Sequence, residues 1–453
     1  MRLLSLGLKR CLAFSSSLGQ YLSITKSGYP SSQLYGLKLL VLLSVAMVLS
    51  GCQIQKLKSD LEVAKQEYGV LTIETLPTTI LTDNKKRVYV AVYRGNGDSR
   101  EMVNFRTTAA GQRQYMIMPM GQYELLAFVD SNDDLIYQPG EPIFWQKTIA
   151  PIALSSLDEQ DSSLQELDAL KLQLEPNLTF KQNLDVSMFG LKRQLAQAKD
   201  KFLHQVDWQD PRFSQQVAQL GMWQPVAFSE QFGFGLYTLD KFEPNKPSVV
   251  FVHGISGSPA QFEQIAEHLA KDVQVLLFQY PSAYPLDYSA YILQVALEEV
   301  VNLYQPSSLA VVAHSMGGLV ARGALVASDN LNSHSIKFIT MATPWSGHFA
   351  ASYGVAYSPV VAPVWRSMVP ESQYLKQIFA TELSTYHQHY LLFAYAKSRG
   401  GEGSANDGSV SLKSQLNEQA QREARKVIGV SDDHTGVLTN SLVYQYINQW
   451  LFD

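Results

Sequence analysis

Short apolar runs alternate with longer amphipathic stretches through the second half of the chain. The apolar runs are continuous, which is typical of strands buried on both faces of a sheet. The predicted strands cover 249–252, 273–278, 309–313, 336–341, 390–395 and 427–430, and the predicted helices cover 260–270, 288–304, 316–327 and 440–451. This alternation predicts an α/β domain over 246–453, with a mostly parallel sheet and helices on both faces.

A different pattern precedes this domain. Three β-rich runs at 88–93, 114–118 and 122–129 are separated by Gly, Asn, Asp and Pro, as in antiparallel strands joined by turns. We therefore predict a small all-β sandwich over 71–153, to which we assign no partner. The run from Met120 to Leu125 resembles strands of Ig-like accessory domains on secreted proteins.

Two polar segments flank the predicted sandwich. Residues 52–70 are polar and favour a helix, and we expect them to form a tether. Residues 154–245 are richer in Gln, Asp, Lys and Leu, with helical spacing around 191–205. We therefore predict a helical connector between the sandwich and the α/β domain.

Composition limits the possible functions. The chain has 453 residues, of which 46% are hydrophobic and 17% charged, so it is globular and large enough for two or three domains. Two cysteines exclude a disulfide scaffold. The net charge of −5 leaves no basic footprint for nucleic acid.

Charge is distributed unevenly along the chain. Five of the 36 basic residues and none of the 41 acidic residues lie in 1–51, so the remainder carries a net charge of −10. A basic, acid-free N-terminus in front of an acidic body indicates a targeting segment. The stretch before Lys38 is long for the basic part of a signal peptide, which suggests a translation start downstream of Met1. Cys11 falls in the segment that would be removed.

The predicted signal peptide, 1–51, ends in a recognisable pattern. An apolar run at 39–48 is followed by Leu49-Ser50-Gly51-Cys52, which resembles the lipobox of bacterial lipoproteins. The resemblance implies that Cys52 carries fatty-acyl chains such as palmitate and tethers the protein to a membrane. Gln53 in place of aspartate favours the outer membrane, facing the periplasm. The alternative is an uncleaved transmembrane helix, although the run is shorter than the ~20 residues that span a bilayer.

A candidate nucleophile follows the predicted strand 309–313. The sequence continues as His314-Ser315-Met316-Gly317-Gly318 and enters a helix, which is the context of a strained turn that exposes a serine hydroxyl. The residues two before and two after this serine must be small, and they are Ala313 and Gly317. The alternative is that Ser315 only caps the helix.

A candidate oxyanion site follows the predicted strand 249–252. His253-Gly254-Ile255 begins a glycine-containing loop that can pass beneath the nucleophile. We expect the N–H of Ile255 to pair with the N–H of Met316 there. The alternative is an ordinary glycine-rich turn.

A base and an acid are expected after the nucleophile. His434 is the one histidine that follows the last predicted strand, and Asp407 lies in an Asn-Asp-Gly turn between Ser315 and His434. Asp407 is positioned to accept the Nδ1 proton of His434. Glu402 is the nearest rival acid, and Asp432 and Asp433 are others. The alternatives are a surface histidine and a plain turn aspartate.

The order Ser315…Asp407…His434 and the motifs around it resemble the α/β-hydrolase fold near its lipase-like branch. The matching stretches also include 343–347 and His253-Gly254. The resemblance implies hydrolysis of acyl or lipid-like carboxylic esters through an acyl-enzyme, with no cofactor. It also implies that the apolar segment 345–388 forms a cap. The alternatives are an acyltransferase with the same residues and a catalytically inactive envelope binding or scaffolding protein.

One further motif lies in the predicted sandwich. Asp130, Asn132, Asp134 and Glu141 have the spacing of the first, third, fifth and twelfth positions of a calcium loop. Leu135 stands where such a loop needs glycine. We therefore favour a polar hairpin turn, with a calcium site as the alternative.

Overall fold

The computed structural model describes most of the chain after residue 50. The described residues are 51–63, 65–77, 88–95, 101–108, 110–111, 113–129, 131, 136–153, 168–175, 184–185, 203–328, 330–396 and 405–452. Residue contacts divide the chain into 1–55 and 56–453. Residues 51–55, with Cys52, are helical, whereas Cys11 and the apolar run 39–48 lie outside the described residues. Among the described residues, none of the helices combines the length and apolar character needed to span a bilayer.

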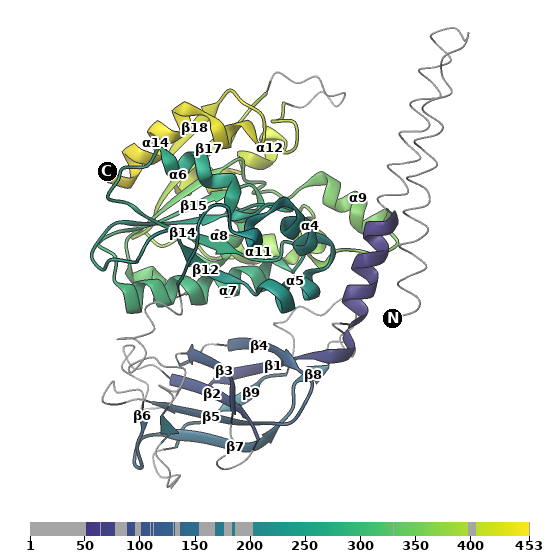
Figure 1. Cartoon of the computed structure of the whole chain (residues 1–453), viewed down its shortest axis with the longest axis vertical. Helices are drawn as coiled ribbons and strands as arrows, with labels where there is room; N and C mark the ends of the chain where they lie inside the picture. Colours follow the sequence, from purple (N-terminus) through teal and green to yellow (C-terminus); the bar gives the residue numbers. More distant parts are fainter. Residues whose placement is uncertain are drawn as a thin grey trace. The chain divides into compact units, whose positions relative to one another are not determined.

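The N-terminal β-rich region contains two four-stranded sheets (Figure 1). In the first, β1 pairs with β4 and β8 antiparallel and with β9 parallel; in the second, the order is β3-β2-β5-β7 and all pairs are antiparallel. The strands are β1 (Tyr68–Thr75), β2 (Val88–Arg94), β3 (Glu101–Thr108), β4 (Arg113–Pro119), β5 (Tyr123–Val129), β7 (Ile143–Ile149), β8 (Ile152–Ala153) and β9 (Leu170–Leu172).

One hydrophobic core joins the two sheets. Ile73 and Met116 from the first sheet pack in the same buried cluster as Val90 and Leu125 from the second. Strand β4 alternates buried and half-buried positions, because successive side chains point to opposite faces. The region is therefore a β-sandwich of the predicted type.

The C-terminal domain is built on an eight-stranded sheet of order β11-β12-β14-β13-β15-β16-β17-β18 (Figure 1). All neighbours are parallel except β12 and β14. All six strands predicted here are confirmed, with ends shifted by a few residues. They are β13 (Ser248–Val252), β14 (Gln274–Gln279), β15 (Leu309–His314), β16 (Ile336–Met341), β17 (Gln388–Ala394) and β18 (Ala424–Val430).

Helices cover both faces of this sheet. Val250 of β13 packs in the core on the side of α7 (Leu286–Glu299) and α8 (Met316–Val326). Its neighbour Phe251 packs in the core on the side of α6 (Glu263–Glu267) and α14 (Ser441–Phe452). Because successive side chains of one strand enter different cores, the strand sequence is apolar throughout.

Residues 154–245, expected to be a helical connector, contribute both helices and strands. Their described part includes α4 (Gln215–Trp223) and α5 (Pro225–Phe232). It also includes β9 of the first sandwich sheet, and β11 (His204–Gln205) and β12 (Gly235–Thr238), which extend the large sheet. Of the helix expected around 191–205, only 203–205 are described, and they include β11. The segment is not wholly helical, because β12 pairs with the large sheet and three of its four residues are buried there.

The described part of the segment expected to be a tether is helical up to Glu67, and its last three residues begin β1. Two residues of the helix, Leu57 and Asp60, are buried. Leu57 is fully buried in the core that contains α7 and α8. The Asp60 carboxylate accepts hydrogen bonds from the N–H groups of Val226 (2.8 Å) and Ala227 (3.0 Å) in the first turn of α5. A carboxylate at this position satisfies amides that have no partner within their own helix.

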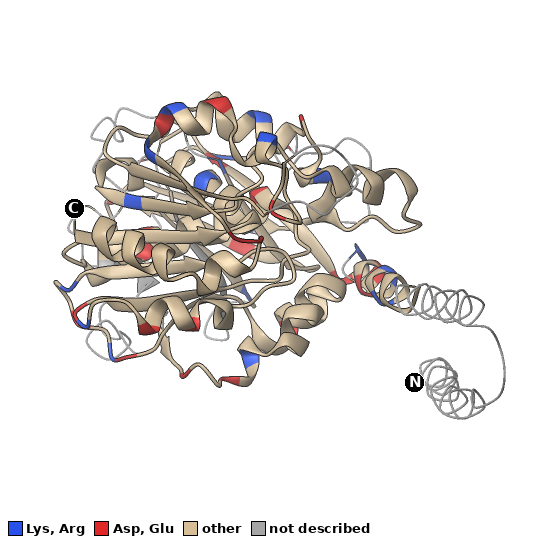
Figure 2. Ribbon diagram, turned by 90° about the horizontal axis from the view of Figure 1, so that it is seen from above, with Lys and Arg blue, Asp and Glu red and all other residues tan. Residues whose placement is uncertain are grey.

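The charged residues of the described part are mixed in sign. Figure 2 shows acidic and basic positions interspersed along the helices that cover the large sheet. The guanidinium group of Arg322 is instead completely buried. Arg322 of α8 pairs with Glu423 at the end of α13 (Glu418–Glu423), donates to the carbonyls of Ile378 (3.0 Å) and Thr381 (3.2 Å), and lies over the ring of Phe379.

This buried pair yields a stability prediction. We expect Arg322→Met to lower the free energy of unfolding of the C-terminal domain by about 3–5 kcal/mol, because Glu423 and two carbonyls lose a fully buried partner. The control is Arg422→Met, which removes an exposed pair with Glu418 and is expected to cost less than about 1 kcal/mol. Urea denaturation followed by tryptophan fluorescence measures both. Equal losses in the two variants would contradict the assignment.

Candidate active site

A strained turn connects β15 to α8. Ser315 has φ 55° and ψ −128°, a conformation that residues with a side chain rarely adopt. A Cβ on Gly317 would lie 2.3 Å from the carbonyl oxygen of Val252 and 2.6 Å from that of His253. The absence of a side chain at Gly317 therefore lets the first turn of α8 press against the end of β13. Ala313, also small, is fully buried in β15.

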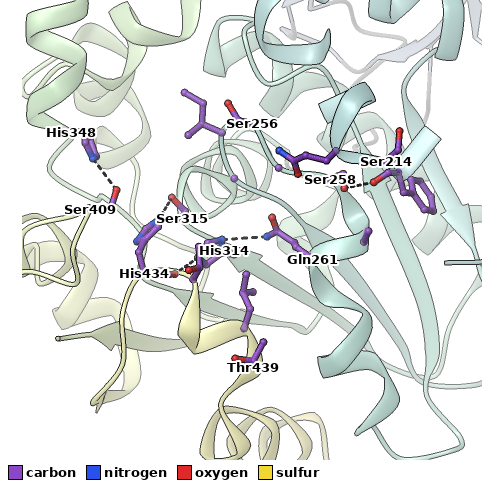
Figure 3. A pocket seen from close by; sticks show the side chains of 18 of the residues that line it. Ser214, Ser256, Ser258, Gln261, His314, Ser315, His348, Ser409, His434 and Thr439 are labelled. Atoms are coloured by element: carbon purple, nitrogen blue, oxygen red, sulfur yellow. Dashed lines mark hydrogen bonds between the residues drawn. The ribbon is translucent and has the colours of Figure 1, made fainter. Parts of the chain in front are cut away.

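Three side chains from separate loops meet beside this turn. The Oγ atom of Ser315 lies 2.9 Å from Nε2 of His434 (Figure 3). On the other side of the ring, Nδ1 of His434 lies 2.6 Å from Oδ2 of Asp407. The three residues follow β15, β18 and β17 respectively, so the parallel sheet brings them together at the carboxyl ends of its strands.

The Asp407 carboxylate is fully buried and held by several donors. Its Oδ1 accepts from the N–H groups of Ser409 (2.9 Å) and Val410 (2.6 Å), and its Oδ2 accepts from Gln415 Nε2 (3.1 Å) as well as His434. Gln415 also bonds to both backbone groups of Ala394 at the end of β17. Gln415 was not predicted as a site residue, because a single glutamine after the acid forms no sequence pattern.

Two of the rival acids, Asp432 and Asp433, are described, and no hydrogen bond joins either of their side chains to the His434 ring. Asp433 accepts from the N–H groups of Thr435 (3.1 Å) and Gly436 (2.7 Å) within its own loop. Asp432 accepts from Asn440 Nδ2 at 2.9 Å. Glu402 lies outside the described residues.

The loop after β13 runs directly beside Ser315. A Cβ on Gly254 would lie 3.0 Å from the Cβ of Ser315, and Ile255 lines the adjoining cavity. Met316 is the first residue of α8, so its N–H has no carbonyl partner within the helix. The loop is held by Tyr280, whose hydroxyl donates to the carbonyl of His253 at 2.7 Å.

Ser315 and His434 line a cavity of about 970 Å³, whereas Asp407 lies buried behind the histidine. This volume is near the upper end of the usual range for ligand sites. One wall is apolar and comes largely from the segment 345–388, which forms α9 (Phe349–Tyr357), α10 (Pro363–Met368) and α11 (Gln373–Ala380). This wall contains Ala351, Gly354, Trp365 and Met368 from that segment and Ile255 from the loop after β13. The opposite wall is richer in polar groups, among them Ser214, Ser258, Gln261 and Thr439 (Figure 3).

A third histidine of the cavity wall, His348, was not predicted from the sequence as a site residue. It caps the N-terminus of α9 by accepting from the N–H of Ala350 at 3.2 Å, and its Nε2 lies 3.5 Å from the hydroxyl of Ser409. Burial lowers the pKa of His348, which favours the neutral ring. Its position directly after the stretch 343–347 was the one sequence feature that could have indicated a place in the site.

A polar hairpin turn was predicted in the sandwich, with a calcium site as the alternative. Asp130, Asn132 and Asp134 lie outside the described residues. Glu141 is described, and its two carboxylate oxygens accept from the N–H groups of Ser131 (2.7 Å) and Gln138 (3.0 Å), a pattern that stabilises a turn. Among the described residues there is no cluster of three or more potential metal-ligating side chains.

Part of the C-terminal domain resembles a known protein family. Residues 249–412 match the model of the Alpha/beta hydrolase family. With its mostly parallel eight-stranded sheet and covering helices, this domain has the α/β-hydrolase fold. The match supports a hydrolase in general terms, and it includes Ser315 and Asp407.

Several solved structures are similar to this chain. Lipase BlEst2 of Bacillus licheniformis is 19% identical with a TM-score of 0.40, covering 48% of this chain and 97% of its own. Aspergillus fumigatus lipase B is 15% identical with a TM-score of 0.36, covering 47% and 55%. Pyrococcus furiosus esterase Pf2001 is 15% identical with a TM-score of 0.34, covering 46% and 80%. No curated protein sequence matches the chain.

The contact at Gly317 yields a prediction. We expect Gly317→Ala to lower the free energy of unfolding by about 1–3 kcal/mol, because the new methyl group meets two fixed backbone carbonyls. The control is Gly121→Ala, where the nearest atom to the added Cβ is 3.4 Å away. The thermal midpoint and soluble yield of both variants are measured. An unchanged midpoint for Gly317→Ala would show that the turn tolerates a side chain.

Proposed function

We propose that this protein is a membrane-anchored serine hydrolase that cleaves carboxylic esters. The observation that carries the proposal is the continuous set of hydrogen bonds from Ser315 Oγ through His434 to Asp407, at 2.9 and 2.6 Å, beside a large cavity. A hydroxyl becomes a nucleophile when an adjacent base removes its proton. A carboxylate that accepts the Nδ1 proton of a histidine keeps the ring in the tautomer whose Nε2 can act as that base.

In the proposed acylation step, Ser315 Oγ attacks the carbonyl carbon of the ester while His434 Nε2 takes the hydroxyl proton. The resulting oxyanion is stabilised by the N–H groups of Met316 and Ile255, and loss of one such donor typically costs about 10²–10³ in rate. The tetrahedral intermediate collapses to the acyl-enzyme, and the imidazolium gives its proton to the departing alcohol. Asp407 keeps Nδ1 protonated and offsets the positive charge of the ring.

Deacylation repeats these roles with water as the nucleophile. His434 removes a proton from the water as its oxygen attacks the acyl carbon, and then returns that proton to Ser315. The apolar wall suits the acyl chain of the substrate, since each buried methylene contributes at most about 0.8 kcal/mol. We therefore propose esters of apolar or lipid-like acyl groups as substrates, with no cofactor.

Membrane attachment is the second part of the proposal. Lys38, the apolar run 39–48 and the residues Leu49-Ser50-Gly51-Cys52 support acylation of Cys52 in a bacterial envelope. Attachment to the outer membrane facing the periplasm is proposed from Gln53. The attached enzyme would work near a lipid surface, where apolar esters concentrate.

Labelling with a fluorophosphonate tests the nucleophile. The wild-type protein is expected to be labelled, and Ser315→Ala should lose labelling together with at least about 10⁴-fold of its activity on a p-nitrophenyl ester. Ser333→Ala, an exposed serine outside the site, serves as the control. Labelling without hydrolysis would favour the acyltransferase alternative, and folded wild-type protein that resists the probe would favour the inactive binding protein.

Labelling with an alkyne analogue of palmitate tests the anchor. We expect incorporation into the wild-type protein expressed in bacteria, and its loss in Cys52→Ser, which should leave the membrane fraction. Cys11→Ser is the matched control and should still be labelled. A Cys52→Ser protein that remains in washed membranes would favour an uncleaved apolar anchor.

A further inference from the structure

His314 stands between the nucleophile and the main chain of the proposed base. It is the last residue of β15, and its side chain is only 4% exposed. Its Nε2 lies 2.8 Å from the carbonyl oxygen of His434, and its Nδ1 lies 3.2 Å from Nε2 of Gln261 (Figure 3). Neither Gln261 nor this use of His314 enters the mechanism proposed above.

The partners of His314 determine which ring nitrogen carries the proton. A carbonyl oxygen only accepts, so the bond to His434 requires a hydrogen on Nε2 of His314. Burial lowers the pKa of His314 to about 3, and the ring is therefore neutral at ordinary pH. In a neutral ring Nδ1 is then the acceptor, and Gln261 must present its NH₂ group to it.

The side-chain amide of Gln261 lies between the loop after β13 and His314. A Cβ on Gly257 would lie 2.5 Å from Gln261 Oε1, so this oxygen packs directly against the backbone of the loop after β13. The backbone N–H of Gln261 donates to the carbonyl of Ser258 at 3.2 Å. With Oε1 on that side, the NH₂ group faces His314. The contacts thus run from the oxyanion loop through Gln261 and His314 to His434.

His434 is consequently fixed at four points. Its backbone N–H donates to the carbonyl of Asp407 at 2.8 Å, its carbonyl accepts from His314, and its two ring nitrogens face Asp407 and Ser315. The bond from His314 is the contact that ties the main chain of the His434 loop to the strand that carries the nucleophile.

We propose that His314, oriented by Gln261, is a positioning residue that holds the main chain of His434 so that its ring stays within reach of Ser315. The proposal rests on the proposed function, because it concerns the same base. A displacement of about 1 Å in a reacting group can cost about 10²-fold in rate. Loss of this bond should therefore lower kcat and leave KM largely unchanged.

Two variants at one position separate this role from a merely structural one. In His314→Gln the side-chain amide nitrogen is as many bonds from Cβ as Nε2 of histidine, so it retains the donor to His434. In His314→Asn the amide nitrogen is only as far from Cβ as Nδ1 of histidine, so it does not reach the carbonyl oxygen of His434. Both variants lose the imidazole, and we expect similar decreases of the thermal midpoint.

The two variants should nevertheless differ in activity. We expect His314→Asn to lower kcat and the rate of fluorophosphonate labelling by about 10²-fold, and His314→Gln to recover at least ten-fold of that loss, with KM within about two-fold for both. Values of kcat within three-fold of each other in the two variants would overturn the proposal. A wild-type protein that resists the fluorophosphonate would instead overturn the proposed function.

A spectroscopic measurement tests the arrangement without relying on activity. With ¹⁵N-labelled histidine, the wild-type spectrum should show His314, assigned by its absence in His314→Gln, as a neutral Nε2–H tautomer down to about pH 5. Gln261→Glu replaces the donor to Nδ1 by an acceptor and should convert the ring to the Nδ1–H or doubly protonated form. An Nδ1–H tautomer in the wild-type protein, or no change in Gln261→Glu, would contradict the proposed pair.

Discussion

The close approach of the first turn of α8 to the end of β13 is the constraint on which the rest of the site depends. Gly317 permits this approach because even one methyl group would overlap the carbonyls of Val252 and His253. The approach forces Ser315 into its strained conformation and brings the start of α8 beside the loop that carries Ile255. Hydroxyl, helix terminus and loop amides are therefore positioned by backbone packing, which changes little when individual side chains move.

The polar groups around this turn are arranged so that few of them carry charge. His253 and His314 are buried, and burial lowers their pKa values to about 4 and about 3, so both rings stay neutral. Asp407 is buried too, but two backbone N–H groups and Gln415 satisfy its oxygens besides His434. Neutral rings and the hydrogen bonds to Asp407 keep these groups in place and avoid the free-energy cost of an unpaired buried charge.

The large parallel sheet was predictable from sequence because strands with two buried faces are continuous apolar runs. The convergence of Ser315, Asp407 and His434 followed from their positions after such strands, since the carboxyl ends of parallel strands share one edge. The short strand β12 was missed because four residues show no periodicity. Gln261 and Gln415 were missed for a related reason. A single polar side chain acquires its partner only when the chain folds, and no pattern in the sequence precedes that contact.

The two ends of the large sheet also bear on how copies of this protein interact. The strand at one end, β11, has only two residues, and the strand at the other end, β18, carries Arg425 and Lys426. An unpaired sheet edge is a template for a strand from another molecule, and shortness or charge at that edge discourages such pairing. A very short strand at one end of the sheet and two basic residues at the other therefore discourage strand pairing between two molecules.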